Sequence, residues 1–132
     1  MNYLGIDWGE KKIGLAISAG DFARPFLVLR MKEHGLGVEE IKKICSEEDV
    51  GKIVIGFPGQ DRNSPVAKKI TGFKGKLEKE IDLPIFFQDE TLSSKEALQK
   101  MIEAGKGQKK RRQEDGFAAA IILQEYLDEL RE

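Results

Sequence analysis

The sequence is poor in the residues on which several kinds of catalytic and structural site depend. It contains one cysteine, Cys45, and one histidine, His34, among 132 residues. A single cysteine excludes an internal disulfide and any zinc site built from several cysteines. A triad that needs a histidine base would have to use His34, and no serine or cysteine motif accompanies it. We therefore expect Cys45 on the buried face of a helix and His34 at the surface.

Long apolar runs are also missing. None approaches the roughly 18 residues that a membrane helix needs, and the N-terminus lacks the basic region and apolar block of a signal peptide. Hydrophobic residues make up 40% and charged residues 34%, a balance typical of a globular protein with a heavily charged surface. The sequence therefore predicts one domain over residues 1–132 that acts in the cytoplasm and has no membrane partner.

The net charge of −1 points to no particular partner, but one segment is strongly basic. Residues 106–112 carry five positive charges and no acid, and they include Lys109, Lys110, Arg111 and Arg112. A dense basic run in a glycine-containing loop can follow a phosphate backbone. A solvated loop without a partner has the same composition. We expect the run to contact nucleic acid.

The spacing of apolar residues predicts five strands and four helices. Alternation on both sides of Gly9 predicts a hairpin. The predicted strands cover residues 3–7, 13–17, 25–29, 52–56 and 83–88, and the predicted helices cover 38–49, 64–81 and a segment that begins at Ser93. A final helix is predicted after the basic loop, with an apolar side made of Ala119, Ile122, Leu123, Tyr126, Leu127 and Leu130. A hairpin followed by strand–helix–strand crossovers predicts an α/β fold, in which a mixed five-stranded sheet carries helices on both faces.

Acidic residues fall at the ends of two predicted strands. Asp7 ends the first strand, and Asp89 and Glu90 end the last one. The functional crevice of such a sheet tends to lie beyond the carboxyl ends of its strands. An ionised carboxylate in a covered strand costs free energy unless a cation or donors surround it, and Gly5 and Gly9 on either side of Asp7 are typical of close approach by a ligand or another backbone. Taken alone, Asp7 fits a metal ligand and a hairpin cap equally well.

The final helix supplies a further acid. Asp115 precedes Ala119 by four residues and Ile122 by seven, so it belongs to the buried stripe near the start of that helix. An aspartate in a first turn can instead remain in water and interact with the helix dipole. Together with the two acidic strand ends, however, Asp115 completes a set of carboxylates that suits hard divalent cations.

Four motifs of this sequence occur in the same order in a known family. Residues 5–16 (Gly-Ile-Asp-Trp-Gly-Glu-Lys-Lys-Ile-Gly-Leu-Ala), 55–58 (Ile-Gly-Phe-Pro), 88–97 (Gln-Asp-Glu-Thr-Leu-Ser-Ser-Lys-Glu-Ala) and 115–124 (Asp-Gly-Phe-Ala-Ala-Ala-Ile-Ile-Leu-Gln) resemble the YqgF family of Holliday-junction-resolvase-like proteins. Members are also described as nucleases for the 5′ end of pre-16S ribosomal RNA. The resemblance runs nearly end to end. It implies a ribonuclease H-like fold with the first strand in the centre.

The resemblance also implies a divalent-metal nuclease site, whose acids fall on Asp7, on the Asp89–Glu90 pair and on Asp115. Two positions depart from the family pattern: Thr91 stands where arginine is usual, and Gly116 stands where alanine is usual. These changes bear on substrate preference more than on the metal site.

These features lead to a specific hypothesis for the chemistry. Two Mg²⁺ or Mn²⁺ ions would assist phosphodiester hydrolysis, with Asp7 bridging the ions and Glu90 and Asp115 each holding one of them. Alternation along a strand sends Asp89 and Glu90 to opposite faces, and we favour Glu90 as the ligand. The residues expected to bind phosphates without reading the sequence are Lys11, Lys12, Arg62, Lys109, Lys110, Arg111 and Arg112.

The substrate and the class of protein stay open at this stage. Structured RNA ranks slightly above branched DNA on the family resemblance, and the protein would act as a monomer or homodimer. A second class is a nucleic-acid-binding module whose metal site has decayed. The Asp-Trp-Gly motif at residues 7–9 also suits the phosphate loop of actin-like ATPases and sugar kinases. Those proteins need two such lobes around the nucleotide, and this chain is long enough for one.

Overall fold

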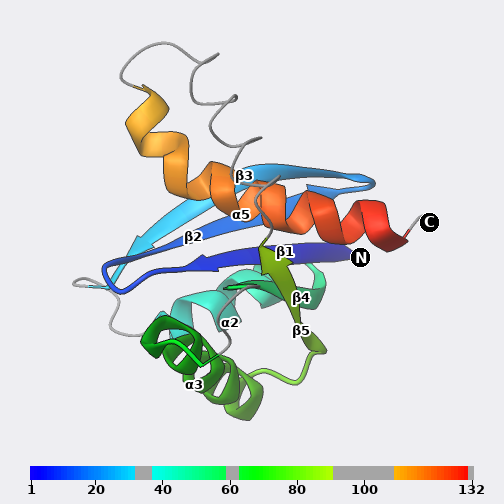
Figure 1. Cartoon of the computed structure of the whole chain (residues 1–132). Coiled ribbons are helices and arrows are strands. Elements are labelled where there is room, and N and C mark those ends of the chain that lie inside the picture. The colour runs from blue at the N-terminus through cyan, green and yellow to red at the C-terminus, as the bar shows by residue number, and fades with distance from the viewer. Residues whose placement is uncertain (32–36, 59–62, 91–108, 131–132) are drawn as a thin grey trace.

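The computed structural model describes residues 1–31, 37–58, 63–90 and 109–130, and for Glu90 and residues 109–115 it gives the course of the backbone. Its elements, shown in Figure 1, follow one another as β1 (Asn2–Trp8), β2 (Lys12–Ala19), β3 (Phe22–Arg30), α2 (Val38–Glu47), β4 (Val50–Pro58), α3 (Pro65–Glu80), β5 (Ile85–Glu90) and α5 (Lys109–Leu130). The predicted strands, the hairpin and three of the four predicted helices are present. The helix predicted from Ser93 and the expected surface position of His34 lie outside the described residues.

The sheet is mixed and has β1 at its centre. Its strand order is β3-β2-β1-β4-β5. β1 and β3 each run antiparallel to β2, whereas β1, β4 and β5 are parallel to one another. The predicted five-stranded mixed sheet, with its first strand in the centre, is therefore confirmed.

Helices cover both faces of this sheet, as Figure 1 shows. α2 and α3 pack on one face, where Leu4 and Ile6 of β1 are fully buried. α5 crosses the other face, where Ala119 and Leu123 are fully buried with Val54 of β4. We call these the α2/α3 face and the α5 face. Because side chains alternate along a strand, the register of each residue determines which face it occupies.

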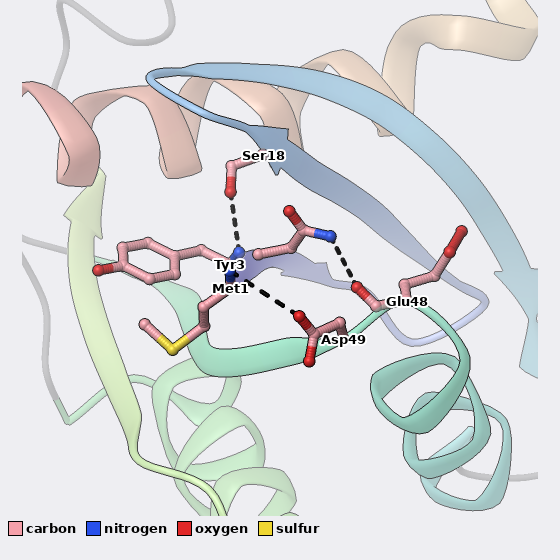
Figure 2. Close-up of polar contacts among 6 residues, drawn as sticks. Met1, Tyr3, Ser18, Glu48 and Asp49 are labelled. Carbon is pink, nitrogen blue, oxygen red and sulfur yellow. Dashed lines mark hydrogen bonds and ion pairs between the residues drawn. The ribbon is translucent and has the colours of Figure 1, made fainter.

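Polar contacts fix the N-terminal end of β1, which Figure 2 shows. The backbone amide of Tyr3 donates to the hydroxyl of Ser18 on β2 at 2.8 Å, and the side-chain amide of Asn2 donates to the carbonyl of Glu48 at 2.7 Å. The N-terminal amine lies 3.8 Å from the carboxylate of Asp49. These contacts join β1 to β2 and to the connection between α2 and β4. They help to set the register of the central strand.

α3 begins at the cap that the sequence predicts. Ser64 has extended backbone angles, its hydroxyl accepts a hydrogen bond from the amide of Ala67 at 3.1 Å, and Pro65 follows in the first turn. Replacing Ser64 with alanine should lower the free energy of unfolding by about 1 kcal/mol, because one N-terminal amide of the helix loses its partner. Urea denaturation measures this loss. Ser64→Asn, which also caps, should restore most of the stability, and an unchanged Ser64→Ala midpoint would contradict the assignment.

The start of the last helix corrects one prediction. The sequence predicts that the whole basic run forms a loop, but Lys109–Arg112 form the first turn of α5. Lysine, arginine and glutamine have high helix propensity, and no glycine or proline interrupts residues 109–115. Charge density alone therefore gave the wrong boundary. Asp115 consequently lies in the second turn of α5 and not in the first.

Cys45 is buried on α2, as predicted. Burial raises the pKa of its thiol to about 11, so the reactive thiolate is suppressed near neutral pH. Among the described residues, no helix combines the length and the hydropathy that crossing a bilayer requires.

Candidate active site at the carboxyl end of the sheet

Asp7 lies near the carboxyl end of the central strand, on the α5 face. The face follows from Gly5, two residues earlier: a Cβ at that position would lie 2.7 Å from Cβ of Leu123 and 2.9 Å from the carbonyl oxygen of Ala119, both on α5. Ile6, between the two, is buried on the opposite face. Asp7 is half-buried, as expected for a carboxylate held by a strand with a neighbour on each side.

The positions beside Asp7 in neighbouring strands are glycines. Asp7 is paired with Gly14 of β2, and on the other side Ile6 is paired with Ile55, which precedes Gly56 of β4. The two positions beside Asp7 in this row therefore carry no side chain. A carboxylate at a strand end suits an oxygen-seeking divalent cation.

The register of β5 separates the two acids at its end. Phe86 stacks on Tyr126 of α5, with ring centroids 6.2 Å apart. Phe87 instead packs against Phe57 in the core of the α2/α3 face, with ring centroids 4.5 Å apart. Continued alternation assigns position 90 to the α5 face and the exposed Asp89 to the α2/α3 face. Position 90, and not position 89, thus shares a face with Asp7. The assignment of Glu90 as a ligand stays a prediction.

Contacts between α5 and β1 give the direction in which α5 runs. Tyr126 contacts Tyr3 with ring centroids 6.1 Å apart, and Leu123 and Ala119, one and two turns earlier, pack on Gly5. Towards its N-terminus, the helix therefore follows β1 towards its carboxyl end. Asp115 lies one further turn along, about 5.4 Å, in the direction of Asp7, which is two strand residues or about 6.6 Å beyond Gly5.

Close packing of α5 against β3 explains the glycine at position 116, and the sequence does not reveal this contact. A Cβ at this position would lie 3.1 Å from Cβ of Pro25 on β3, so the missing side chain lets α5 approach that strand closely. Gln124 reinforces the contact, since its side-chain oxygen accepts from the amide of Ala23 at 2.8 Å and its nitrogen donates to the carbonyl of Asp21 at 3.0 Å. The helix that carries Asp115 is therefore attached to the sheet at several points.

The glycines beside Asp7 correct another interpretation. Gly5 admits α5, and a Cβ at Gly9 would lie 2.7 Å from the carbonyl oxygen of Lys12 in the turn after β1. Both glycines accommodate neighbouring backbone. They therefore do not indicate a ligand, and the case for a metal rests on the acids.

Among the residues whose side chains are described, no three acidic, histidine or cysteine side chains come together. Two of the three predicted ligands, Glu90 and Asp115, lie outside that set. The structure places Asp7 and position 90 on the α5 face at the carboxyl ends of β1 and β5, and α5 runs towards that end of the sheet. The metal ligand set stays a prediction.

The predicted phosphate-binding residues divide into two groups. Lys11 and Lys12 are exposed at the turn into β2, and Met31 donates its amide to the carbonyl of Lys11 at 2.9 Å. Arg62 and the side chains of 109–112 lie outside the described part of the chain.

Sequence reasoning missed two polar residues near the turn after β1. Lys69 of α3 forms an ion pair with Glu10. The hydrogen bond from Lys69, followed by its charge, holds the pKa of Glu10 below its usual range. The sequence did contain a signal for Lys69. Lysines 69 and 76 are two turns apart, so they lie on one side of the predicted helix.

Comparison with known proteins identifies the family. The family model described as "RuvX: Holliday junction resolvase" matches residues 1–129. The chain belongs to the RuvX family. The predicted resemblance to YqgF, another name for RuvX, is thereby confirmed.

A Maridesulfovibrio salexigens protein described as "Putative pre-16S rRNA nuclease" is 40% identical to this RuvX-family chain over 134 residues, covering 96% of the chain and 98% of the relative. A Clostridium botulinum protein with the same description is 36% identical over 135 residues, covering 98% of each.

Solved structures confirm the ribonuclease H-like fold of this RuvX-family chain. RuvC of Thermus thermophilus, in complex with a Holliday junction substrate, superposes with a TM-score of 0.63 at 17% identity and covers 98% of this chain and 96% of its own. The fowlpox virus resolvase, with its Holliday junction DNA, gives a TM-score of 0.64 at 12% identity and covers both chains completely. At these identities the likeness establishes the fold.

Proposed function

We propose that this RuvX-family member is a divalent-metal-dependent endonuclease that hydrolyses phosphodiester bonds, acting in the cytoplasm on the 5′ end of precursor 16S ribosomal RNA. One observation carries the proposal. Asp7 and position 90 lie on the α5 face at the carboxyl ends of their strands, and α5 runs towards that same end of the sheet. The descriptions of the relatives favour precursor rRNA as the substrate.

Each proposed residue has a distinct part. Asp7, which the central strand holds between two neighbours, would be a ligand of both ions. Glu90 from β5 and Asp115 from α5 would each hold one of them. Bound there, a pair of Mg²⁺ or Mn²⁺ ions would lower the pKa of the attacking water and neutralise charge on the leaving oxygen. Lys11 and Lys12 bind phosphates at the edge of the site without reading base sequence.

A substrate panel tests the proposal. The protein is incubated with Mn²⁺ and with precursor rRNA 5′ ends, four-way DNA junctions and plain duplex. We expect cleavage of the precursor RNA, loss of cleavage on chelation, and no cleavage of plain duplex. Cleavage restricted to four-way junctions, with two symmetric incisions by a dimer, would make the protein a junction resolvase. Binding without cleavage of any substrate, together with no Asp7-dependent Mn²⁺ binding in calorimetry, would leave a non-catalytic binding module.

The basic start of α5 gives a separate prediction about affinity. Replacing Lys109 and Lys110 with glutamine should flatten the dependence of log affinity on log salt by about 0.9 for each phosphate of duplex DNA that the variant no longer binds. Lys42→Gln/Lys43→Gln on α2 removes the same charge from lysines that pair with Glu80 and Glu47. That control should leave the slope unchanged. Equal slopes for the two double variants would exclude the basic run from the binding surface.

A further inference from the structure

We propose that a pocket on the opposite face of the strand end from Asp7 binds one unpaired nucleotide of the substrate next to the cleavage position, its base against Trp8 and its phosphates on Lys69 and Lys76. The pocket has a volume of about 280 Å³ and is lined by Trp8, Lys69, Gly72, Phe73 and Lys76. We call it the Trp8 pocket. The inference rests on the proposed nucleic-acid substrate and adds a binding site to it.

The position of Trp8 links the pocket to the candidate active site. Trp8 follows Asp7 directly, so their Cα atoms are about 3.8 Å apart, yet alternation places the two residues on opposite faces. Trp8 is half-buried and packs against the core of the α2/α3 face, which fixes its ring. A strand of nucleic acid that crosses the end of β1 can therefore meet the carboxylate on one side and the ring on the other.

Gly72 keeps the pocket open. A Cβ added at this position would meet no atom within 4 Å. Glycine is unfavourable in a helix interior, and at this position its missing side chain leaves space beside the ring. The volume lies just below the roughly 300–1,000 Å³ typical of pockets for drug-sized ligands. It suits one base with its sugar better than a complete dinucleotide cofactor.

Two lysines supply positive charge at the pocket. Lys69 and Lys76 are two turns apart on the same side of α3, and both are exposed. Lys69 is paired with Glu10, whereas Lys76 forms no ion pair among the described residues. A phosphate that reaches Lys69 must compete with the carboxylate of Glu10. Glu10 therefore opposes phosphate binding. Removing its charge should strengthen binding, whereas filling the pocket should weaken it.

The combination of groups favours a nucleotide over other ligands. A fixed aromatic ring beside cations is the arrangement by which proteins hold single strands, since bases stack on the ring and phosphates meet the charges. An inorganic anion would not need the ring, and an apolar ligand would not need the lysines. A paired base is already stacked within its helix and cannot enter.

The intrinsic fluorescence of Trp8 provides the test, because it is the only tryptophan in the sequence. The full chain is titrated in chelator with a single-stranded oligoadenylate of about eight nucleotides. We expect saturable quenching, and much weaker quenching by a blunt duplex of equal length. Equal quenching by the duplex would overturn the proposal, because a paired base cannot stack on the ring.

Two matched variants test the pocket without touching Trp8, whose removal could unfold the core. Gly72→Leu fills the pocket and should weaken oligoadenylate binding about tenfold, the effect of losing one base stack. Gly75→Leu, at a second α3 glycine whose added Cβ meets nothing within 4 Å, should bind like wild type. Both changes raise helix propensity equally. Equal affinities of the two variants would overturn the proposal.

Removing the competing acid gives an independent measurement. Glu10→Gln frees Lys69 and should tighten binding about threefold, the scale of one exposed ion pair. Unchanged or weaker binding would contradict the phosphate role of Lys69. All these titrations are made without metal, so they are separate from cleavage. If Gly72→Leu weakens quenching but no substrate is cleaved, the nuclease proposal is refuted and the pocket proposal stands. If cleavage depends on Asp7 but Gly72→Leu has no effect on quenching, the pocket proposal is refuted and the nuclease proposal stands.

Discussion

Replacing Asp7 with asparagine is expected to reduce Mn²⁺- or Mg²⁺-dependent cleavage by about a thousandfold or more. Metal ions of this kind contribute several kcal/mol of transition-state stabilisation, and each 1.36 kcal/mol is about a factor of ten in rate. Asparagine has nearly the shape of aspartate but no charge, so it weakens the proposed bridge without changing the packing around β1. Initial rates at saturating metal measure the effect, and calorimetry with Mn²⁺ shows whether binding disappears with it.

The pair of acids at the end of β5 offers a matched control for Asp7→Asn. Glu90→Gln should also lose most of the activity, whereas Asp89→Asn should stay within about twofold of wild type, because the register assigns Asp89 to the opposite face. Thermal unfolding of each variant confirms that it is folded before its rate is compared. Undiminished cleavage by Asp7→Asn would refute the nuclease site. A loss in Asp89→Asn instead of Glu90→Gln would reverse the choice between the two ligands.

Replacing Gly5 with alanine should destabilise the fold by about 2–3 kcal/mol, the usual cost of overpacking a closely packed core. The added Cβ would lie 2.7 Å from Cβ of Leu123 and 2.9 Å from the carbonyl of Ala119, and neither atom is the end of a flexible side chain. α5 must therefore move away from β1. For a chain of this size the melting temperature should fall by about 10 °C.

The same change should impair cleavage at temperatures where the variant is still folded. α5 carries Asp115, so moving the helix separates this acid from Asp7. Gly75→Ala is the control: its Cβ meets nothing within 4 Å, and it should raise stability by up to about 1 kcal/mol through helix propensity. A Gly5→Ala variant with wild-type stability would show that α5 does not pack on β1 as described.

Much of the fold could be predicted because its signals are local. Strand alternation gives the hairpin around Gly9, and Ser64 with Pro65 marks the start of α3. The start of α5 was predicted wrongly. A dense run of lysine and arginine occurs both in loops and in helices, and local composition does not distinguish the two. In the sequence, Gly116 is only a departure from the alanine usual in the family. The packing reason for the glycine depends on Pro25, which is far away in the sequence.

The sequence by itself determined the strands, most of the described helix boundaries and the family, since periodicity, capping and motif spacing are properties of neighbouring residues. The choice of acids as metal ligands stays a prediction. Only the tertiary structure decided on which face each residue lies. That depends on strand pairing and on which helix covers which side: Asp7 shares a face with α5 because Gly5 admits that helix, and Trp8 lines a pocket because α3 packs across the other side. Such contacts join residues far apart in the chain, so they arise when the sheet and its helices pack together.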